Sequence, residues 1–72
     1  MKVGIIGAGN MGGAIACGLA SGRIVDSCDI CITCPNRRRE LDKIKAFDPE
    51  VKVSTNNIDA VNGCDIIILA VK

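Results

Sequence analysis

Hydrophobic and polar positions along the chain fall into alternating segments whose spacing predicts four strands and three helices. Four short apolar segments rich in β-branched residues predict strands at residues 1–6, 30–34, 51–53 and 65–71. The intervening segments have the spacing or boundary residues of helices, at about residues 11–21, 38–47 and 58–62. The order is therefore β-α-β-α-β-α-β. Strands that alternate with helices indicate an α/β fold with a parallel sheet and right-handed crossovers.

The helical segments also predict which side chains face the sheet. In the first helix the residues expected in the buried stripe are Met11, Ala14, Ile15, Gly18 and Leu19. Gly22 and Gly63 are expected to cap the first and third helices in left-handed conformations. The second helix is polar, with Leu41 and Ile44 on its inner side.

Composition narrows the kind of core and the kind of partner. Of 72 residues 49% are hydrophobic, and Phe47 is the single aromatic residue, so the core is aliphatic, which suits a buried parallel sheet. The last strand, Ile66–Val71, is apolar throughout and is expected to be covered on both faces. The net charge of +1 lacks the basic excess of nucleic-acid-binding domains. With no spanning apolar run and no signal peptide, we expect no membrane partner and a cytoplasmic location.

The cysteines do not form the pattern of a metal site or of a disulfide framework. They are Cys17, Cys28, Cys31, Cys34 and Cys64. An odd number without a secretion signal argues against structural disulfides. The run from Cys28 to Cys34 lacks a fourth iron–sulfur ligand, and Cys31 and Cys34 would face opposite sides of a strand. The chain has no histidine, so zinc is also unexpected, and ordinary core or loop positions are the simpler interpretation.

A glycine motif joins the first predicted strand to the first predicted helix. Residues 7–12, Gly-Ala-Gly-Asn-Met-Gly, match G-x-G-x-x-G in the context that a Rossmann-like nucleotide fold requires. Gly7 would allow the tight turn, Gly9 would let a pyrophosphate approach the backbone, and Gly12 would let the helix pack on the strand. The helix N-terminus would then meet the phosphates. The alternative is a structural strand–turn–helix unit without a ligand.

The end of the second strand favours NADP(H) over NAD(H), although NAD(H) stays possible. NAD-binding domains place a carboxylate there, whereas this chain has Arg37, Arg38 and Arg39 and no carboxylate until Glu40. Guanidinium groups bind a 2′-phosphate with paired hydrogen bonds. Arg37 is nearest the strand end and is the best candidate, followed by Arg38. The alternative is that the arginines form a solvated helix start.

The opening residues 1–14, with Ala70-Val71-Lys72 at the end of the last strand, resemble the N-terminal domain of pyrroline-5-carboxylate reductase. The resemblance covers the whole chain. It implies an enzyme of proline biosynthesis that reduces 1-pyrroline-5-carboxylate to proline with NAD(P)H. Hydroxyacid dehydrogenases of the 6-phosphogluconate type and F420-dependent NADP reductases begin similarly and stay as alternatives, as does a non-catalytic nucleotide-binding module.

The resemblance also implies the cofactor contacts. The pyrophosphate would lie on Ile6, Gly7, Ala8, Gly9, Asn10 and Met11. The adenosine ribose and its phosphate would lie among Cys34, Asn36 and Arg37, where family members often have Ser or Asn in place of Cys34. Asn57 matches a cofactor-contacting position, and a helix N-cap is the alternative role for it. Ala70, Val71 and Lys72 match the loop beside the nicotinamide ribose, with main-chain contact expected at Lys72.

Members of the resembled family are several times longer than 72 residues. Their C-terminal helical domain dimerises and supplies most of the substrate pocket. We therefore expect residues 1–72 to be the N-terminal part of a truncated dinucleotide-binding domain, inactive alone, with no catalytic residue among them. The expected partners of the full-length enzyme are the small-molecule substrate and further copies of itself.

Overall fold

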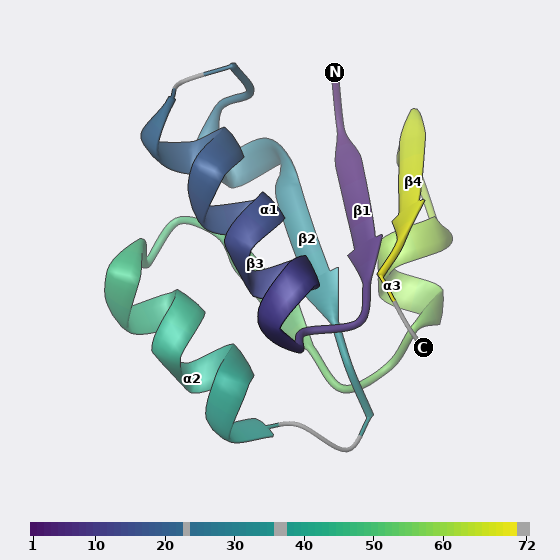
Figure 1. Ribbon diagram of the computed structural model, residues 1–72. Coiled ribbons are helices and arrows are strands. Elements are labelled where there is room, and N and C mark those ends of the chain that lie inside the picture. The colour runs from purple at the N-terminus through teal and green to yellow at the C-terminus, as the bar shows by residue number, and fades with distance from the viewer. Residues whose placement is uncertain (23, 36–37, 71–72) are drawn as a thin grey trace.

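The computed structural model describes residues 1–22, 24–35 and 38–70, and it confirms the predicted α/β fold (Figure 1). The strands are β1 (Val3–Ile6), β2 (Ile30–Thr33), β3 (Lys52–Ser54) and β4 (Ile66–Leu69). The helices are α1 (Asn10–Ser21), α2 (Arg38–Phe47) and α3 (Ile58–Val61), with a short 3₁₀ turn, η1 (Ser27–Asp29). All strand pairs are parallel and the strand order is β3-β2-β1-β4. This order matches the first four strands of a Rossmann sheet, whose full order is 3-2-1-4-5-6.

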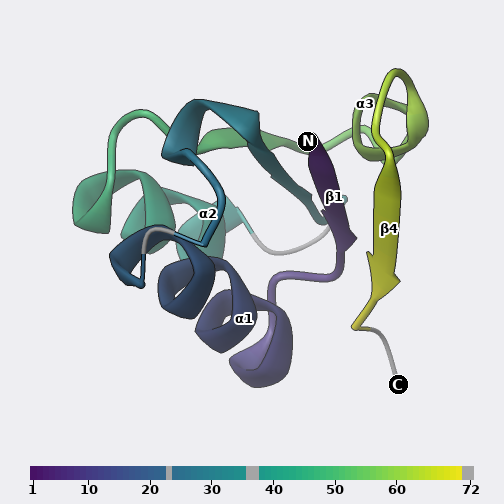
Figure 2. The ribbon, with the colours of Figure 1, turned by 90° about the horizontal axis from the view of Figure 1, so that it is seen from above.

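The helices cover the sheet from both sides. Figure 2 shows α1 and α2 together on one face and α3 on the other. The chain crosses over after β3, because β4 returns to pair with β1 on the side away from β2. All four strands therefore end at the same edge of the sheet, where β1 leads into the glycine motif. Within the described ranges, no helix is both long and apolar enough to cross a bilayer.

The core lies between the sheet and the helices α1 and α2. Alternate residues of β1 and β2 point into it: Val3, Ile5, Ile30 and Ile32 are all buried. The predicted inner residues of α2, Leu41 and Ile44, are buried in the same cluster, as expected. Val51 and Val53 pack against it from β3 and the residue before it. Most of the buried aliphatic side chains thus lie in one layer, between the sheet and the helices α1 and α2.

The opposite face is covered closely by α3 at Gly4. A Cβ on Gly4 would lie 1.9 Å from the carbonyl oxygen of Ala60, which is shorter than any real contact. Ala60 itself is fully buried. A glycine at the centre of β1 is therefore what allows the backbone of α3 to rest on the sheet.

The buried stripe of α1 differs from the predicted one. Met11, Ala14 and Gly18 are exposed, whereas Gly12, Ala16 and Ala20 are buried and Ile15 and Leu19 are partly buried. The smallest side chains of α1 lie where the helix comes closest to the sheet, and the larger apolar side chains lie on either side of them. A periodicity of apolar residues alone does not distinguish these two faces when alanine and glycine dominate.

Three further details correct the sequence-based expectations. Gly22 ends α1 in a right-handed conformation, with φ of −78°, so only Gly63, with φ of 78°, provides a left-handed cap. The strands are shorter than predicted, since β1 begins at Val3 and β2 ends at Thr33. Strand β4 is an edge strand in the described part of the chain, and Ile66, Ile67 and Leu69 are exposed there.

Candidate cofactor-binding site

The glycine loop lies at the carboxyl edge of the sheet, held between β2 and β4. The N–H of Gly7 donates to the carbonyl oxygen of Thr33 at 2.7 Å. On the other side, the N–H of Ala70 donates to the carbonyl oxygen of Ile6 at 2.8 Å. Both bonds continue the parallel ladders one residue beyond the strands, so the loop leaves the sheet from a fixed position. In parallel α/β sheets ligands bind in the crevice outside this edge.

Two of the three motif glycines, Gly7 and Gly12, occupy positions where the fold itself needs glycine, and Gly9 differs from them. Gly7 has φ of 110°, in the region that side chains rarely adopt, and so makes the turn. A Cβ on Gly12 would lie 1.8 Å from the carbonyl oxygen of Gly7, so only glycine lets α1 start this close to the loop. A Cβ on Gly9 would meet no atom within 4 Å, so nothing in the chain itself requires glycine there. The space at Gly9 fits a ligand that approaches the backbone, as a pyrophosphate does.

The start of α1 is suited to an anion. The helix has 12 residues, no acidic residue in its first turn and no side-chain hydrogen bond at its N-cap residue, Gly9. Its first intrahelical bond runs from the N–H of Gly13 to the carbonyl oxygen of Gly9 at 2.9 Å. The N–H groups before Gly13 therefore have no intrahelical acceptor, and the helix dipole adds partial positive charge. A dinucleotide pyrophosphate has the oxygens that such groups bind.

Asn57 is half-buried at the same edge, and its side chain does not cap α3. Its Oδ1 accepts a hydrogen bond from the hydroxyl of Thr33 at 2.8 Å. Asn56 takes the capping role instead, since its Oδ1 accepts from the N–H of Ile58 at 3.0 Å. Asn57 thus occupies the N-cap position of α3, as the alternative expected, but its side chain bonds to Thr33 of β2 and not to the helix.

Thr33 and Asn56 are the residues of this site that the motifs did not indicate. Thr33 is fully buried and uses both its carbonyl oxygen, toward Gly7, and its hydroxyl, toward Asn57. Strand alternation could have identified it, because Thr33 lies on the face opposite Ile32 and Ile30. The competition between two adjacent asparagines for the cap could not be decided from sequence.

The second strand ends near the expected ribose position. Cys34 is half-buried and packs against the core cluster, and its N–H donates to the carbonyl oxygen of Ser54 at 3.1 Å. Asn36 and Arg37 lie outside the described residues, and of Arg38 the structure describes the backbone, as the first residue of α2. Asp29, a carboxylate close to β2 in sequence, precedes the strand and so lies at the opposite edge of the sheet.

The third part of the expected site follows β4. Ala70 is half-buried. A Cβ added at Gly12 would lie 3.3 Å from the Cβ of Ala70, so this segment runs beside the start of α1. Val71 and Lys72 lie outside the described residues. The glycine loop, the end of β2, Asn57 and Ala70 thus converge on one edge of the sheet. Gly7 and Ala8 are buried at this edge and Ile6 and Gly9 are half-buried, whereas the side chain of Met11 is exposed at the surface.

Cys31 and Cys34 lie on opposite faces of the sheet. Cys34 packs toward the core, whereas Cys31 lines a hollow on the α3 face. Opposite placement is what strand alternation predicts for a spacing of three residues. No cluster of three or more potential metal ligands occurs among the residues that the structure describes.

These features are those of a dinucleotide-binding domain on a Rossmann-like sheet. A family model described as "NADP oxidoreductase coenzyme F420-dependent" matches residues 2–72, and the chain belongs to this family. It is therefore the NADP-binding domain of an oxidoreductase. No curated protein matches the chain.

Proposed function

We propose that this chain is the NADPH-binding part of an enzyme that reduces 1-pyrroline-5-carboxylate to L-proline. The observation that carries the proposal is the glycine loop of residues 7–12, with its open space at Gly9, joined to the sequence resemblance of residues 1–14 and 70–72. The family to which the chain belongs includes the N-terminal domains of pyrroline-5-carboxylate reductases. NADP(H) is the proposed cofactor, and the family description supports it.

In this proposal the cofactor runs along the carboxyl edge of the sheet. The backbone of residues 6–12 binds the pyrophosphate, and Asn57 donates from its amide to the bound nucleotide. The adenosine ribose and its 2′-phosphate are assigned to residues at the end of β2: Cys34, Asn36, Arg37 and Arg38. The main chain of residues 70–72 contacts the nicotinamide ribose.

The reaction needs one hydride and one proton. A cofactor held by these residues would supply the hydride for the imine carbon, and a proton would complete the amine of proline. The residues of this chain bind and orient the cofactor, and we assign no catalytic residue among them. As the resemblance implies, we propose that the substrate pocket and the dimer contacts lie in a further helical domain and not within residues 1–72.

The test is the activity of the full-length gene product. We expect it to oxidise NADPH only when 1-pyrroline-5-carboxylate is present, with proline formed in equal amount. A Gly9→Ala variant of the same protein is the matched control, because the added Cβ meets no atom of the chain. Activity should fall in that variant while its circular dichroism stays unchanged. An active cofactor site with no turnover of the imine would overturn the proposal.

A second candidate is favoured by the family description, which names coenzyme F420. In that case the hydride would pass between a reduced deazaflavin and NADP⁺ at the same sheet edge. The same protein, given reduced deazaflavin and NADP⁺ in place of the imine, distinguishes the two reactions. A third assay, with a hydroxyacid of the 6-phosphogluconate type as substrate, tests the remaining dehydrogenase alternative. A stop codon directly after Lys72 in the gene would favour a non-catalytic module.

A further inference from the structure

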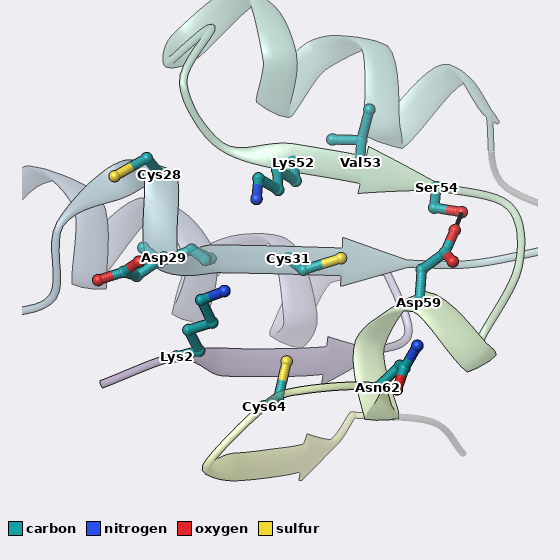
Figure 3. A pocket seen from close by; sticks show the side chains of 11 residues that line it. Lys2, Cys28, Asp29, Cys31, Lys52, Val53, Ser54, Asp59, Asn62 and Cys64 are labelled. Carbon is teal, nitrogen blue, oxygen red and sulfur yellow. Dashed lines mark hydrogen bonds between the residues drawn. The ribbon is translucent and has the colours of Figure 1, made fainter.

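A hollow of about 370 Å³ lies on the α3 face of the sheet, away from the glycine loop (Figure 3). Two cysteines from distant parts of the chain line it: Cys31 in the middle of β2, and Cys64 between α3 and β4. Figure 3 shows the sulfur of Cys64 pointing across β1 toward β2, where the sulfur of Cys31 lies. The cofactor site uses neither side chain.

Gly4 is what brings the two thiols toward each other. In the parallel register Gly4 pairs with Cys31, so the two residues are neighbours on adjacent strands. A Cβ on Gly4 would lie 3.1 Å from the sulfur of Cys64. The Cys64 sulfur therefore occupies the place beside Cys31 that a side chain on β1 would otherwise fill. No side chain stands between the two sulfurs on that strand.

The surroundings of the pair are half-buried and carry charges of both signs. Cys31 and Cys64 are each intermediate in exposure, so small reagents can reach them. Lys2 and Lys52 extend toward β2 from either side of the hollow (Figure 3). Burial raises the pKa of the Cys31 thiol, and negative charge at Cys64 and Asp59 raises that pKa further, against a smaller opposing effect of Lys52.

We propose that Cys31 and Cys64 are a redox-active pair. They form a disulfide with each other when a low-molecular-weight disulfide such as glutathione disulfide oxidises them. One protein thiolate attacks glutathione disulfide, which forms a mixed disulfide and releases one glutathione. The second protein thiolate then attacks the protein sulfur of that mixed disulfide and releases the second glutathione. The two cysteines together lose two electrons and two protons, and glutathione disulfide is reduced to two glutathione molecules.

The bond would join β2 to the segment after α3, across β1. It would close a long loop of chain, residues 31–64, which contains α2, β3 and α3. A cross-link over a loop of this length restricts the unfolded chain strongly, so the oxidised protein should melt at a higher temperature. Dithiothreitol should return the melting temperature to its original value.

The experiment uses two variants of the chain that each keep two cysteines. The first keeps Cys31 and Cys64, by Cys17→Ser, Cys28→Ser and Cys34→Ser. The second keeps Cys28 and Cys64, by Cys17→Ser, Cys31→Ser and Cys34→Ser. Cys28 is a matched control, because it lines the same hollow but its sulfur points away from the other two (Figure 3).

Each variant is treated with glutathione disulfide, and its intact mass is measured by mass spectrometry. The first should lose two hydrogen atoms and carry no glutathione, and its melting temperature should rise. The second should carry glutathione adducts without an internal bond. Stable adducts on the first variant, a linked dimer, or equal cross-linking of both variants would overturn the proposal.

A measurement on the unmodified chain keeps the test independent of how the variants fold. Trypsin separates residues 24–37, which contain Cys28, Cys31 and Cys34, from residues 53–72, which contain Cys64 alone. The oxidised chain should yield these two peptides linked, and fragment ions should place the link at Cys31. A link at Cys28 or Cys34 would overturn the proposal.

Discussion

The hydroxyl of Thr33 donates a hydrogen bond of 2.8 Å to Oδ1 of Asn57. The same residue accepts the N–H of Gly7 on its carbonyl oxygen, so one buried threonine joins the glycine loop to the start of α3. Two parts of the proposed cofactor site that lie far apart in sequence, the glycine loop and Asn57, are thereby fixed to one strand end. Asn56 completes the arrangement by capping α3, which leaves Asn57 to the site.

Replacing the Thr33 hydroxyl should remove the hydrogen bond that fixes the orientation of the Asn57 side chain. Thr33→Val keeps the shape but leaves Oδ1 of Asn57 without its donor, which should cost about 1 kcal/mol in stability and a similar amount in NADPH binding. Thr33→Ser keeps the hydroxyl and should retain NADPH affinity better. Calorimetric titration of both variants with NADPH provides the comparison. Equal affinities for Thr33→Val and Thr33→Ser would show that the hydrogen bond does not position Asn57.

Gly9→Ala should separate binding from folding. The added methyl group meets no atom of the chain within 4 Å, and the φ of −70° at this position is one that alanine adopts readily. The free energy of unfolding should therefore change little. NADPH affinity should fall at least about tenfold, because the methyl group occupies the space of the pyrophosphate. Unchanged affinity in a folded variant would mean that no phosphate approaches the backbone at this point.

Two glycines of α1 should respond oppositely to alanine. Gly12→Ala places a Cβ 1.8 Å from the Gly7 carbonyl oxygen, so the loop or the helix must move, at a cost of about 2 kcal/mol or more. Gly18 is exposed on the same helix with open space around it, and Gly18→Ala should stabilise the fold by about 0.5–1 kcal/mol. Urea unfolding of both variants measures this difference. A neutral Gly12→Ala would contradict the packing described for the loop.

Stability should depend on pH through Asp48. The Ser27 hydroxyl and then the Glu50 N–H donate to its carboxylate and lower its pKa from the ordinary 3.8. A carboxyl with a lowered pKa in the folded state contributes stability above its unfolded pKa, and this is lost as pH falls through the folded pKa.

The stability difference between wild type and Ser27→Ala should therefore be larger near neutral pH than well below pH 3.8. Urea unfolding at a series of pH values measures it. The exposed Ser21 provides the control variant, Ser21→Ala, whose effect should not vary with pH in this range. A constant difference for Ser27→Ala would contradict the role of this hydrogen bond.

The sequence was sufficient for the order and type of the main elements, because each carries a local signal. The bounds of α2 agree with the prediction, since Leu41 and Ile44 stand out in a polar segment and Pro49 follows. The glycine motif likewise indicated the roles of Gly7 and Gly12, which follow from backbone geometry. The inner face of α1 was predicted only in part: Ile15 and Leu19 pack against the core, but Ala14 is exposed. Ala14 and Ala16 are equally apolar, and only the sheet distinguishes them.

Features that depend on contacts between distant segments could not be predicted in this way. The need for glycine at position 4 arises from the carbonyl of Ala60, which is brought there by the crossover after β3. The pairing of Thr33 with Asn57 depends on the same crossover. The exposure of β4 also depends on its place at the edge of the sheet, whereas its apolar sequence alone indicated coverage on both faces.

The measurement that tests the central claim most directly is the pair of dissociation constants of the full-length protein for NADPH and NADH, by calorimetric titration. We expect NADPH to bind about tenfold to a hundredfold more tightly, because charge-assisted hydrogen bonds to its 2′-phosphate contribute about 1.5–3 kcal/mol each. Arg37→Ala should remove most of that preference while leaving NADH affinity nearly unchanged. Equal affinities, tighter binding of NADH, or no binding of either nucleotide would contradict the assignment of this chain as a NADPH-binding domain.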